Sequence, residues 1–335
     1  MEHTTALSVK DLKTYFYTNS RCNKAIDGVS FDIKKGKTLC IVGESGCGKS
    51  VTASSIMQLL PTLSRIEAGS SITYHADNGD VEIQGLERNG TKMRNLRGAE
   101  IAMIFQDPMT ALNPVYTVGY QIGEILQYHT DLNKKQIREK TISLLADMGI
   151  PLPEKRVDEY PHNYSGGMRQ RAMIAMAMAC SPKILIADEP TTALDVTIQA
   201  QIFELMDKLK KEHGTAIMLI THDMGVVAEL ADDVAVMYMG KIVEAGSIDE
   251  VLRTPKHPYT QALLSSIPVL GRGKNQDIKA IRGSTPDPYD RPKGCQFEPR
   301  CDFATEACGT YPDEEQATPT HRVSCWNYKE VDQNG

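Results

Sequence analysis

The residues with the most specific chemistry lie in a glycine-rich segment near the N-terminus. Residues 43–50 read GESGCGKS, which fits the spacing G-x-x-x-x-G-K-[ST]. The glycines free the backbone to turn successive N–H groups toward one anion, and the helix expected after them adds its positive dipole end. Lys49 could then reach the β- and γ-phosphate oxygens, and the Ser50 hydroxyl could ligate Mg²⁺. The segment predicts a nucleoside triphosphate site, with an ordinary glycine-rich turn as the alternative. The predicted nucleotide contacts are Gly43, Glu44, Ser45, Gly46, Cys47, Gly48, Lys49, Ser50 and Val51.

Four polar residues follow short apolar runs that read as buried strands, namely Gln106, Asp188, Glu189 and His222. Ligands of open α/β sheets bind at the carboxyl ends of the strands, so these side chains are expected near the glycine-rich loop. Ser50 and Gln106 are candidate Mg²⁺ ligands, because this hard cation prefers oxygen. Successive side chains of a strand point to different sides, so one of Asp188 and Glu189 could hold Mg²⁺ near Ser50 and the other could polarise an attacking water. Gln106 and His222 are the other candidate catalytic residues. A solvated glutamine and a structural histidine are the alternatives for those two residues taken singly.

The elements that must position these residues indicate an α/β fold. Apolar and polar residues alternate at 7–16 and 26–33, which predicts a small antiparallel sheet before the loop. A buried strand is expected at 37–42 and a helix at 51–60, on either side of the loop.

A second, helical region interrupts this pattern. Apolar residues at three- and four-residue spacing predict helices at 118–129 and 134–148, within an inserted subdomain at about 107–165. Ser165 and the two glycines after it open an alanine- and methionine-rich helix, so Ser165 is expected to be its N-cap. The exposed N–H groups there predict a second anion site.

Three adjacent aromatic residues, Tyr15, Phe16 and Tyr17, lie at the end of the first predicted strand. One of them could stack on an adenine ring, since stacking needs an aromatic face and little further geometry. We assign this role to Phe16, with core packing as the alternative.

Composition limits the classes of function. The formal net charge of −6 argues against a broad nucleic-acid-binding face, so no nucleic-acid partner is expected. The longest apolar run, at 172–180, is about half of what a spanning helix needs, and the N-terminus lacks the layout of a signal peptide. We expect a cytosolic chain whose membrane association comes through a partner.

In order and spacing, these motifs resemble the motif set of ATP-binding cassette (ABC) ATPases over residues 7 to 250. The resemblance implies a P-loop NTPase (RecA-like) core with an antiparallel β-subdomain and an inserted helical subdomain, together forming a nucleotide-binding domain at 1–250. It implies bound ATP and Mg²⁺. It also adds roles: catalytic Glu189, switch residue His222, Q-loop residue Gln106 and a D-loop at Asp195. The signature motif corresponds to Ser165, Gly166, Gly167 and Gln170, although YSGGMRQ has tyrosine and methionine where the family has leucine and glutamine.

The family pairs two such domains head to tail, so that the signature serine of one completes the ATP site of the other. One copy is present here, which implies that the chain pairs with itself or with a homologous ABC ATPase subunit, and the expected partner is a homologous subunit in a heterodimer. A chromosome-maintenance ATPase is disfavoured, because no extended heptads separate Lys49 from Ser165 and no basic stripe is present. A translation-factor-like ATPase would need a second cassette in the chain.

The C-terminal region narrows the resemblance. Residues 255–264 (PKHPYTQALL) and 294–301 (GCQFEPRC) are similar to the extension of oligopeptide, dipeptide and nickel importer ATPases, especially the dipeptide "D"-type subunit. That likeness implies an ATPase on the cytoplasmic face of the inner membrane, bound peripherally to two transmembrane permease subunits and supplied by an extracytoplasmic peptide-binding protein. Nickel or another small solute of the same subfamily is the alternative cargo.

Cys295, Cys301, Cys308 and Cys325 cluster in the predicted extension at 251–335. Their spacings are looser than the close pairs typical of zinc sites and favour a [4Fe-4S] cluster held by four thiolates, and the resemblance points the same way. Zinc and unligated thiols remain as alternatives. A separate metal- or redox-sensing module in the C-terminal region, gating the ATPase, is compatible with the transport-ATPase hypothesis.

Overall fold

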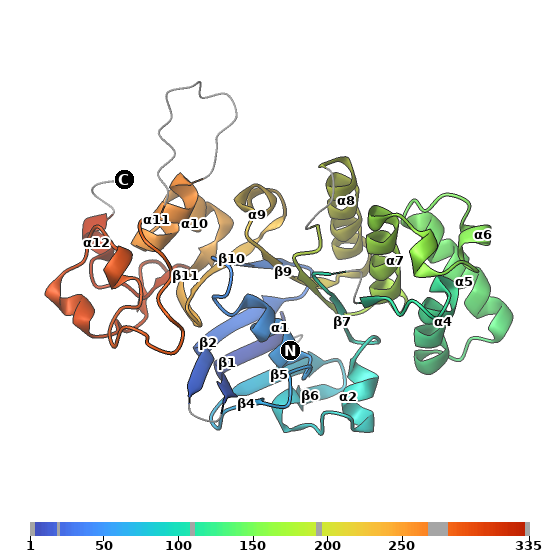
Figure 1. The fold of residues 1–335 in the computed structure, drawn as a ribbon, viewed down its shortest axis with the longest axis horizontal. Coiled ribbons are helices and arrows are strands. Elements are labelled where there is room, and N and C mark those ends of the chain that lie inside the picture. The colour runs from blue at the N-terminus through green and yellow to red at the C-terminus, as the bar shows by residue number, and fades with distance from the viewer. Residues whose placement is uncertain (1–3, 19–20, 108–110, 192–195, 267–280, 332–335) are drawn as a thin grey trace.

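The structure, a computed structural model, describes residues 4–18, 21–107, 111–191, 196–266 and 281–331. Two sheets form its centre, with a helical subdomain at one end and the C-terminal extension at the other (Figure 1). The smaller sheet has the order β2-β1-β5-β6, with β4 also paired to β1. Its strands are β1 (Thr5–Tyr17), β2 (Cys22–Lys34), β4 (Ser64–Ile66), β5 (Ser71–Ala76) and β6 (Gly79–Glu82). All its pairings are antiparallel, as the alternation at 7–16 and 26–33 predicted for the first two strands.

The larger sheet has the order β12-β13-β11-β10-β3-β9-β8-β7. Its strands are β3 (Thr38–Val42), β7 (Ile101–Ile104), β8 (Ile184–Asp188), β9 (Ala216–Thr221), β10 (Asp233–Tyr238), β11 (Lys241–Ser247), β12 (Glu315–Gln316) and β13 (Arg322–Val323). From β10 to β7 the strands are parallel, so the segments after β3, β7, β8 and β9 emerge at one edge. This edge is where the sequence places the candidate site.

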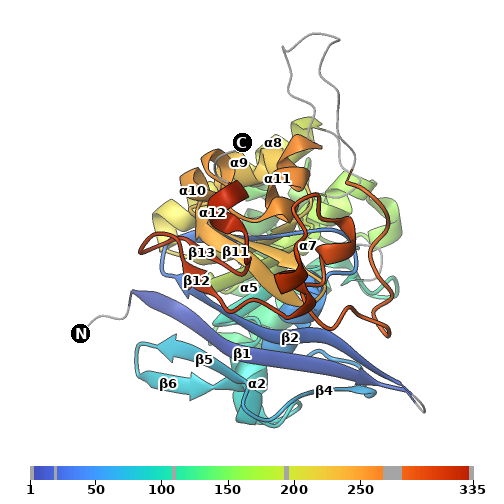
Figure 2. The ribbon, with the colours of Figure 1, turned by 90° about the vertical axis from the view of Figure 1, so that its left-hand side faces the viewer.

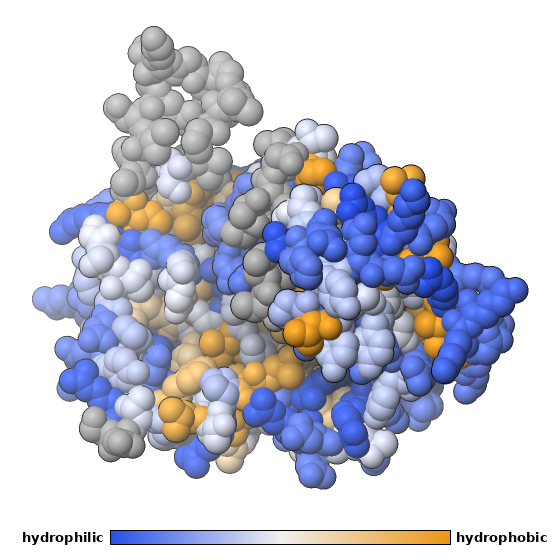
Figure 3. All heavy atoms as spheres, turned by 45° about the vertical axis from the view of Figure 1, so that its right-hand side comes forward, coloured by the Kyte–Doolittle hydropathy of each residue, from blue (hydrophilic) through white to orange (hydrophobic). Residues whose placement is uncertain are grey.

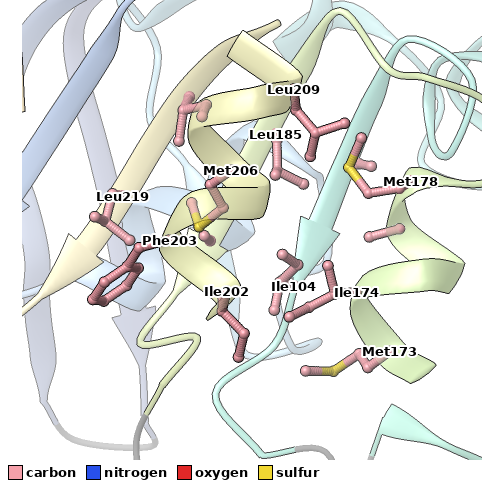
Figure 4. Close-up of a cluster of buried hydrophobic side chains, with 14 of the residues drawn as sticks. Ile104, Met173, Ile174, Met178, Leu185, Ile202, Phe203, Met206, Leu209 and Leu219 are labelled. Atoms are coloured by element: carbon pink, nitrogen blue, oxygen red, sulfur yellow. The ribbon is translucent and has the colours of Figure 1, made fainter. Parts of the chain in front are cut away.

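The parallel strands are buried on both faces. Alternate residues of β3 belong to two different hydrophobic clusters, because successive side chains point to opposite sides of a sheet. On one side β3 packs with the small sheet and α1 (Lys49–Ile56); on the other lie α7 (Gly166–Met178) and α8 (Val196–His213). Figure 4 shows this second layer, where Ile174 of α7 lies beside Ile104 of β7, and Phe203 of α8 lies beside Leu219 of β9. The resulting core holds the strand ends, and hence the site, in fixed relative positions.

The helical subdomain comprises α4 (Val118–His129), α5 (Lys134–Asp147), α6 (Pro153–Arg156) and η2 (Pro161–Asn163), and leads into α7. The helices predicted at 118–129 and 134–148 are confirmed. Thr117 caps α4 by accepting a hydrogen bond from the Tyr120 N–H, and Asn133 caps α5 in a capping box with Gln136. With this end turned forward, the right-hand part of the surface is largely hydrophilic with small hydrophobic patches, and a larger hydrophobic area lies to the lower left of it (Figure 3).

The helix after the glycine-rich loop is shorter than predicted. Helix α1 ends at Ile56 rather than continuing to residue 60, because Gln58 adopts a positive φ of 49° that a helix cannot contain. The other elements of the cassette are η1 (Ile83–Gly85), α2 (Thr91–Leu96) and α9 (Met224–Leu230).

The C-terminal extension packs beside the sheets (Figure 2). It contains α10 (Ile248–Arg253), α11 (Pro258–Ser265), η3 (Glu298–Arg300), η4 (Glu306–Gly309) and α12 (Tyr328–Val331). Strand β13 pairs with β11, so the extension continues the main sheet. A fully buried polar contact supports this junction: His321 Nε2 lies 2.7 Å from a Glu244 carboxylate oxygen, and Glu244 also accepts from the N–H groups of Lys256 and His257.

Candidate nucleotide site

The glycine-rich loop is built around positions that only glycine can occupy. Gly43 has a φ of 151°, and a Cβ there would lie 2.1 Å from the Met237 carbonyl oxygen. Gly48 has a φ of 111°, and its Cβ would meet the Ala25 carbonyl oxygen at 2.6 Å. Backbone from β10 and β2 therefore packs directly against the loop and fixes its shape.

Lys49 folds back over the loop that precedes it. Its Nζ donates to the carbonyl oxygens of Gly43 at 2.7 Å and Glu44 at 3.0 Å. The side chain is buried, with 6% of the residue exposed, so the ammonium group is held in one place. This position suits an ammonium that is to meet phosphate oxygens bound over the loop.

The two candidate Mg²⁺ ligands from α1 and β8 meet directly. The Ser50 hydroxyl donates to Asp188 Oδ1 at 3.0 Å, and only 4% of Asp188 is exposed. Burial raises the pKa of Asp188 and the charge of Glu189 adds to this, while the hydrogen bond from Ser50 and the charge of Lys49 oppose it. A divalent cation would relieve the desolvated carboxylate, so this pair fits a Mg²⁺ ion.

Glu189 is the meeting point of three strand ends. Its carboxylate accepts a hydrogen bond from Gln106 Nε2 at 2.9 Å and lies 3.2 Å from His222 Nδ1, so Gln106, Glu189 and His222 converge from the ends of β7, β8 and β9. Its backbone has a φ of 45°, and its N–H donates to the Ile220 carbonyl at 2.9 Å. Such a left-handed conformation costs a non-glycine residue about 1–2 kcal/mol, and residues held this way cluster at functional sites. Gln106 thus contacts the candidate base, whereas Ser50 and Asp188 contact each other.

The three aromatic residues of β1 lie on different faces of the strand. The hydroxyls of Tyr15 and Tyr17 donate to Asp27 at 2.6 Å and to Glu67 at 2.7 Å. Phe16 points to the opposite face, which it shares with Thr14, whose Oγ1 lies 2.8 Å from Ser55 Oγ of α1. Phe16 is therefore the aromatic residue of the three on the α1 side of the sheet, which keeps it as the candidate for adenine stacking.

The signature residues do not lie beside the glycine-rich loop. Ser165 caps α7 by accepting from the Met168 N–H at 3.3 Å, and α7 packs on β7 at the edge of the sheet, whereas the loop follows β3. Ser165 and Gly166 are exposed, but Gln170 is 1% exposed and donates to the Pro190 carbonyl, so Gln170 faces the interior rather than a ligand. Asp195 lies outside the described residues.

Glu44 has partners that the sequence did not indicate. Arg300 of the extension forms two hydrogen bonds with its carboxylate, and the Tyr259 hydroxyl accepts from its N–H. Residues 255–264 and 294–301, which hold Tyr259 and Arg300, were singled out only for their family likeness. Glu44 stays a predicted nucleotide contact, and its carboxylate is held by Arg300 of the extension.

Cys295, Cys301, Cys308 and Cys325 line one small cavity together with His257. Burial, and the charges of the neighbouring thiols, raise the pKa of Cys325 to about 12. Nδ1 of His257 accepts from the Tyr259 N–H at 3.0 Å, which leaves a buried Nε2 donor without a hydrogen-bond partner. The four thiols could bind a sulfide-containing metal group as thiolates, and the His257 N–H could donate a hydrogen bond to it, so the lining of this cavity fits an iron–sulfur cluster. In the described ranges, however, no three His, Cys, Asp or Glu side chains are positioned to hold a metal ion, so the predicted cluster lacks support from preformed ligands.

Comparison with known proteins places this geometry in a family. A family model described as ABC transporter matches residues 26–192, and one described as oligopeptide/dipeptide transporter, C-terminal region, matches residues 243–308. The dipeptide transport ATP-binding protein DppD of Bacillus subtilis is 49% identical over 321 residues, covering 96% of this chain and 94% of the relative. This chain belongs to the ABC transporter family.

Other comparisons agree. The oligopeptide transport ATP-binding protein AppD of Bacillus subtilis is 47% identical and covers 97% of this ABC chain and 98% of the relative. The solved structure of cbiO1 from Clostridium perfringens, part of an ABC transporter complex, is 28% identical, with a TM-score of 0.61 over 75% of this chain and 92% of that one. A dimeric bacterial ABC transporter cassette, MJ0796, gives a TM-score of 0.63 at 25% identity, over 72% and 98%. The predicted family, cassette fold and ATPase class are confirmed. Within the described residues, no helix is long and apolar enough to cross a membrane.

Proposed function

We propose that this chain is the ATP-hydrolysing subunit of an importer that takes up dipeptides or oligopeptides. The observation that carries the catalytic part is the convergence of Gln106 and His222 on the carboxylate of Glu189, beside the Ser50–Asp188 pair. The cargo class rests on the similarity to dipeptide and oligopeptide transport ATP-binding proteins over nearly the whole chain.

In the proposed reaction the loop N–H groups and Lys49 bind the phosphates of ATP. Ser50 and Asp188 would hold Mg²⁺, which would supply positive charge beside the phosphate oxygens. Glu189 accepts a proton from the attacking water. The water oxygen bonds to the γ-phosphorus while the bond between the γ-phosphorus and the oxygen that leaves with ADP breaks. Gln106 and His222 hold the Glu189 carboxylate in place, and the amide oxygen of Gln106 is a further candidate ligand that could hold Mg²⁺.

A second ATPase subunit completes each site in this proposal. Ser165, Gly166 and Gly167 are exposed or half-buried at the start of α7, so their hydroxyl and N–H groups are available to a nucleotide held by a partner. A homologous subunit, in a heterodimer, is the proposed partner. Ser165→Arg should then block hydrolysis while leaving ATP binding to the loop of the same chain unchanged.

The proposed membrane partners are two permease subunits, which would hold the chain peripherally on the cytoplasmic face of the inner membrane, with an extracytoplasmic peptide-binding protein supplying cargo. Exposed apolar residues at the start of the helical subdomain support a docking surface: Val115, Tyr116 and Tyr120 are 47–69% exposed. The rings of Tyr116 and Tyr120 stack with centroids 4.9 Å apart. Tyr116→Ser should reduce co-purification with the permease, whereas Tyr128→Ser, which alters another exposed tyrosine of α4, should not.

Uptake by cells lacking the native gene tests the function. Wild type should restore import of a radiolabelled dipeptide or of a longer peptide, and Glu189→Gln should restore neither. Restoration of nickel uptake without peptide uptake would favour the alternative cargo. Peptide import restored by Glu189→Gln would contradict the proposed catalytic role.

We also propose that Cys295, Cys301, Cys308 and Cys325 hold a [4Fe-4S] cluster, with a structural or sensing role. Support comes from their shared cavity and the unpartnered Nε2 of His257. Protein purified without oxygen should contain about four irons and four sulfides per chain, and Cys301→Ser should lose them. Zinc without sulfide would indicate a zinc module, and no metal would leave the thiols as packing residues.

A further inference from the structure

The C-terminal extension holds the glycine-rich loop at Glu44, from both sides of this residue. Arg300 donates to the two carboxylate oxygens of Glu44 at 2.6 and 2.9 Å, and Thr285 Oγ1 lies 3.2 Å from one of them. The backbone N–H of Glu44 donates to the Tyr259 hydroxyl at 2.8 Å. Side chain and main chain of one loop residue are therefore fixed by residues of the extension.

Arg300 is itself held rigidly. Its side chain is 4% exposed, its Nε donates to the Arg282 carbonyl at 2.9 Å, and one terminal nitrogen lies 3.3 Å from the Tyr238 hydroxyl. The hydrogen bonds from Arg300 lower the pKa of Glu44, although burial opposes them, so this residue is a carboxylate at neutral pH. A two-pronged bond between a buried guanidinium and a carboxylate fixes direction as well as distance.

An aromatic cluster stiffens the same contact. The rings of Tyr238, Tyr259 and Phe297 lie with centroids 4.7–5.4 Å apart, which joins β10, α11 and the segment before Arg300. Tyr238 and Tyr259 are fully buried, so the hydroxyl that receives the Glu44 N–H cannot easily move away.

Lys49 links the contact between Glu44 and the extension to the nucleotide site. Its ammonium is held by the carbonyl oxygens of Gly43 and Glu44, at 2.7 and 3.0 Å. The peptide group between these two residues consists of the Gly43 carbonyl and the Glu44 N–H. Because Tyr259 binds that N–H and Arg300 binds the side chain of Glu44, the extension sets the orientation of the carbonyls that place the ammonium.

We propose that the C-terminal extension braces the phosphate-binding loop, and that Arg300 and Tyr259 are positioning residues for ATP. Neither residue needs to touch nucleotide. The proposal rests on the ATP site and is independent of the cargo and of any metal bound to the cysteines.

The test compares conservative variants with matched controls from the same extension. Arg300→Lys keeps the charge but loses the two-pronged bond, and Tyr259→Phe loses only the hydroxyl. The controls are Arg322→Lys, whose guanidinium binds the Glu314 carboxylate, and Tyr311→Phe, whose hydroxyl bonds to Ser324. Binding of a fluorescent ATP analogue with Mg²⁺ is titrated for each full-length variant, alongside steady-state ATP hydrolysis and a thermal unfolding scan.

We expect the dissociation constant and KM for ATP to rise about tenfold in Arg300→Lys and about threefold in Tyr259→Phe, with kcat within twofold of wild type, the size expected from losing one or two hydrogen bonds. The controls should change nucleotide affinity less than twofold. Glu44→Gln should weaken binding as Arg300→Lys does, and the double variant should be no weaker than either single variant, because both act through one contact.

Unchanged nucleotide affinity in folded Arg300→Lys and Tyr259→Phe would overturn the brace, whatever happens to their unfolding temperatures. Equal losses in the controls would do the same, since they would indicate general loosening of the extension. Lys49→Ala distinguishes a failure of the brace from a wrong assignment of the nucleotide site. Retained ATP binding by that variant would refute the nucleotide site itself.

Discussion

Replacing Glu189 with glutamine separates nucleotide binding from chemistry at this site. The change keeps the size of the side chain and the backbone at φ 45° but removes the charge that can accept a proton from water. Glutamine has one acceptor oxygen, so it can serve only one of the two donors now at 2.9 and 3.2 Å, Gln106 Nε2 and His222 Nδ1. Its amide group would face the other as a second donor.

The magnitude follows from these contacts. General-base catalysis contributes typically 10²–10⁴ in rate, so kcat should fall by that factor, or about 3–5 kcal/mol in the barrier. Lys49, Ser50 and Asp188 keep their own partners, so the dissociation constant for Mg²⁺-ATP should change less than about twofold.

Phosphate release at saturating Mg²⁺-ATP measures kcat, and titration with a fluorescent ATP analogue measures binding, on the chain purified with its native assembly. Glu229→Gln, an exposed change on α9, is the matched control and should behave as wild type. Hydrolysis by Glu189→Gln within tenfold of wild type would refute the assignment of the base. Loss of ATP binding in this variant would show that Glu189 supports the phosphate site rather than the water.

Three further outcomes follow from the same structure. Gly46 and Gly48 both have positive φ, but a Cβ at Gly46 meets nothing within 4 Å, so in urea denaturation Gly46→Ala should cost about 1–2 kcal/mol and Gly48→Ala about 2–5; equal costs would contradict the crowding at Gly48. Despite opposing desolvation, hydrogen bonds from Thr318 and Ser247 hold the pKa of Glu250 at about 2, below its usual 4.5. The difference in unfolding free energy between wild type and Glu250→Gln, measured from unfolding midpoints, should therefore be largest above about pH 5 and vanish as the pH falls toward 2. A difference that does not change with pH would exclude this linkage. Anaerobic Cys301→Ser should lose iron and sulfide together, and a variant that keeps both would remove that thiol from the proposed ligands.

Several parts of the site could be predicted because local sequence fixes them. The glycine spacing at 43–50 leaves few shapes for the loop, and apolar runs followed by Gln106, Asp188 and His222 mark the carboxyl ends of parallel strands. The sequence pattern could not predict which of these side chains contact each other. Whether Gln106 faces the metal pair or Glu189 depends on loop geometry after β7, and the choice of Phe16 depends on which face of β1 turns toward α1.

The sequence by itself determined the chemistry that the cassette can perform, because the motif residues lie close together along the chain or at strand ends. Only the tertiary structure decided what holds the loop in shape. Glu44 and Arg300 are separated by 256 positions, and no periodicity or motif connects them. Their contact exists because β13 joins β11 and the aromatic cluster brings the extension against β10, next to the strand that leads into the loop. Long-range packing of this kind depends on the whole fold, which local residue patterns do not encode.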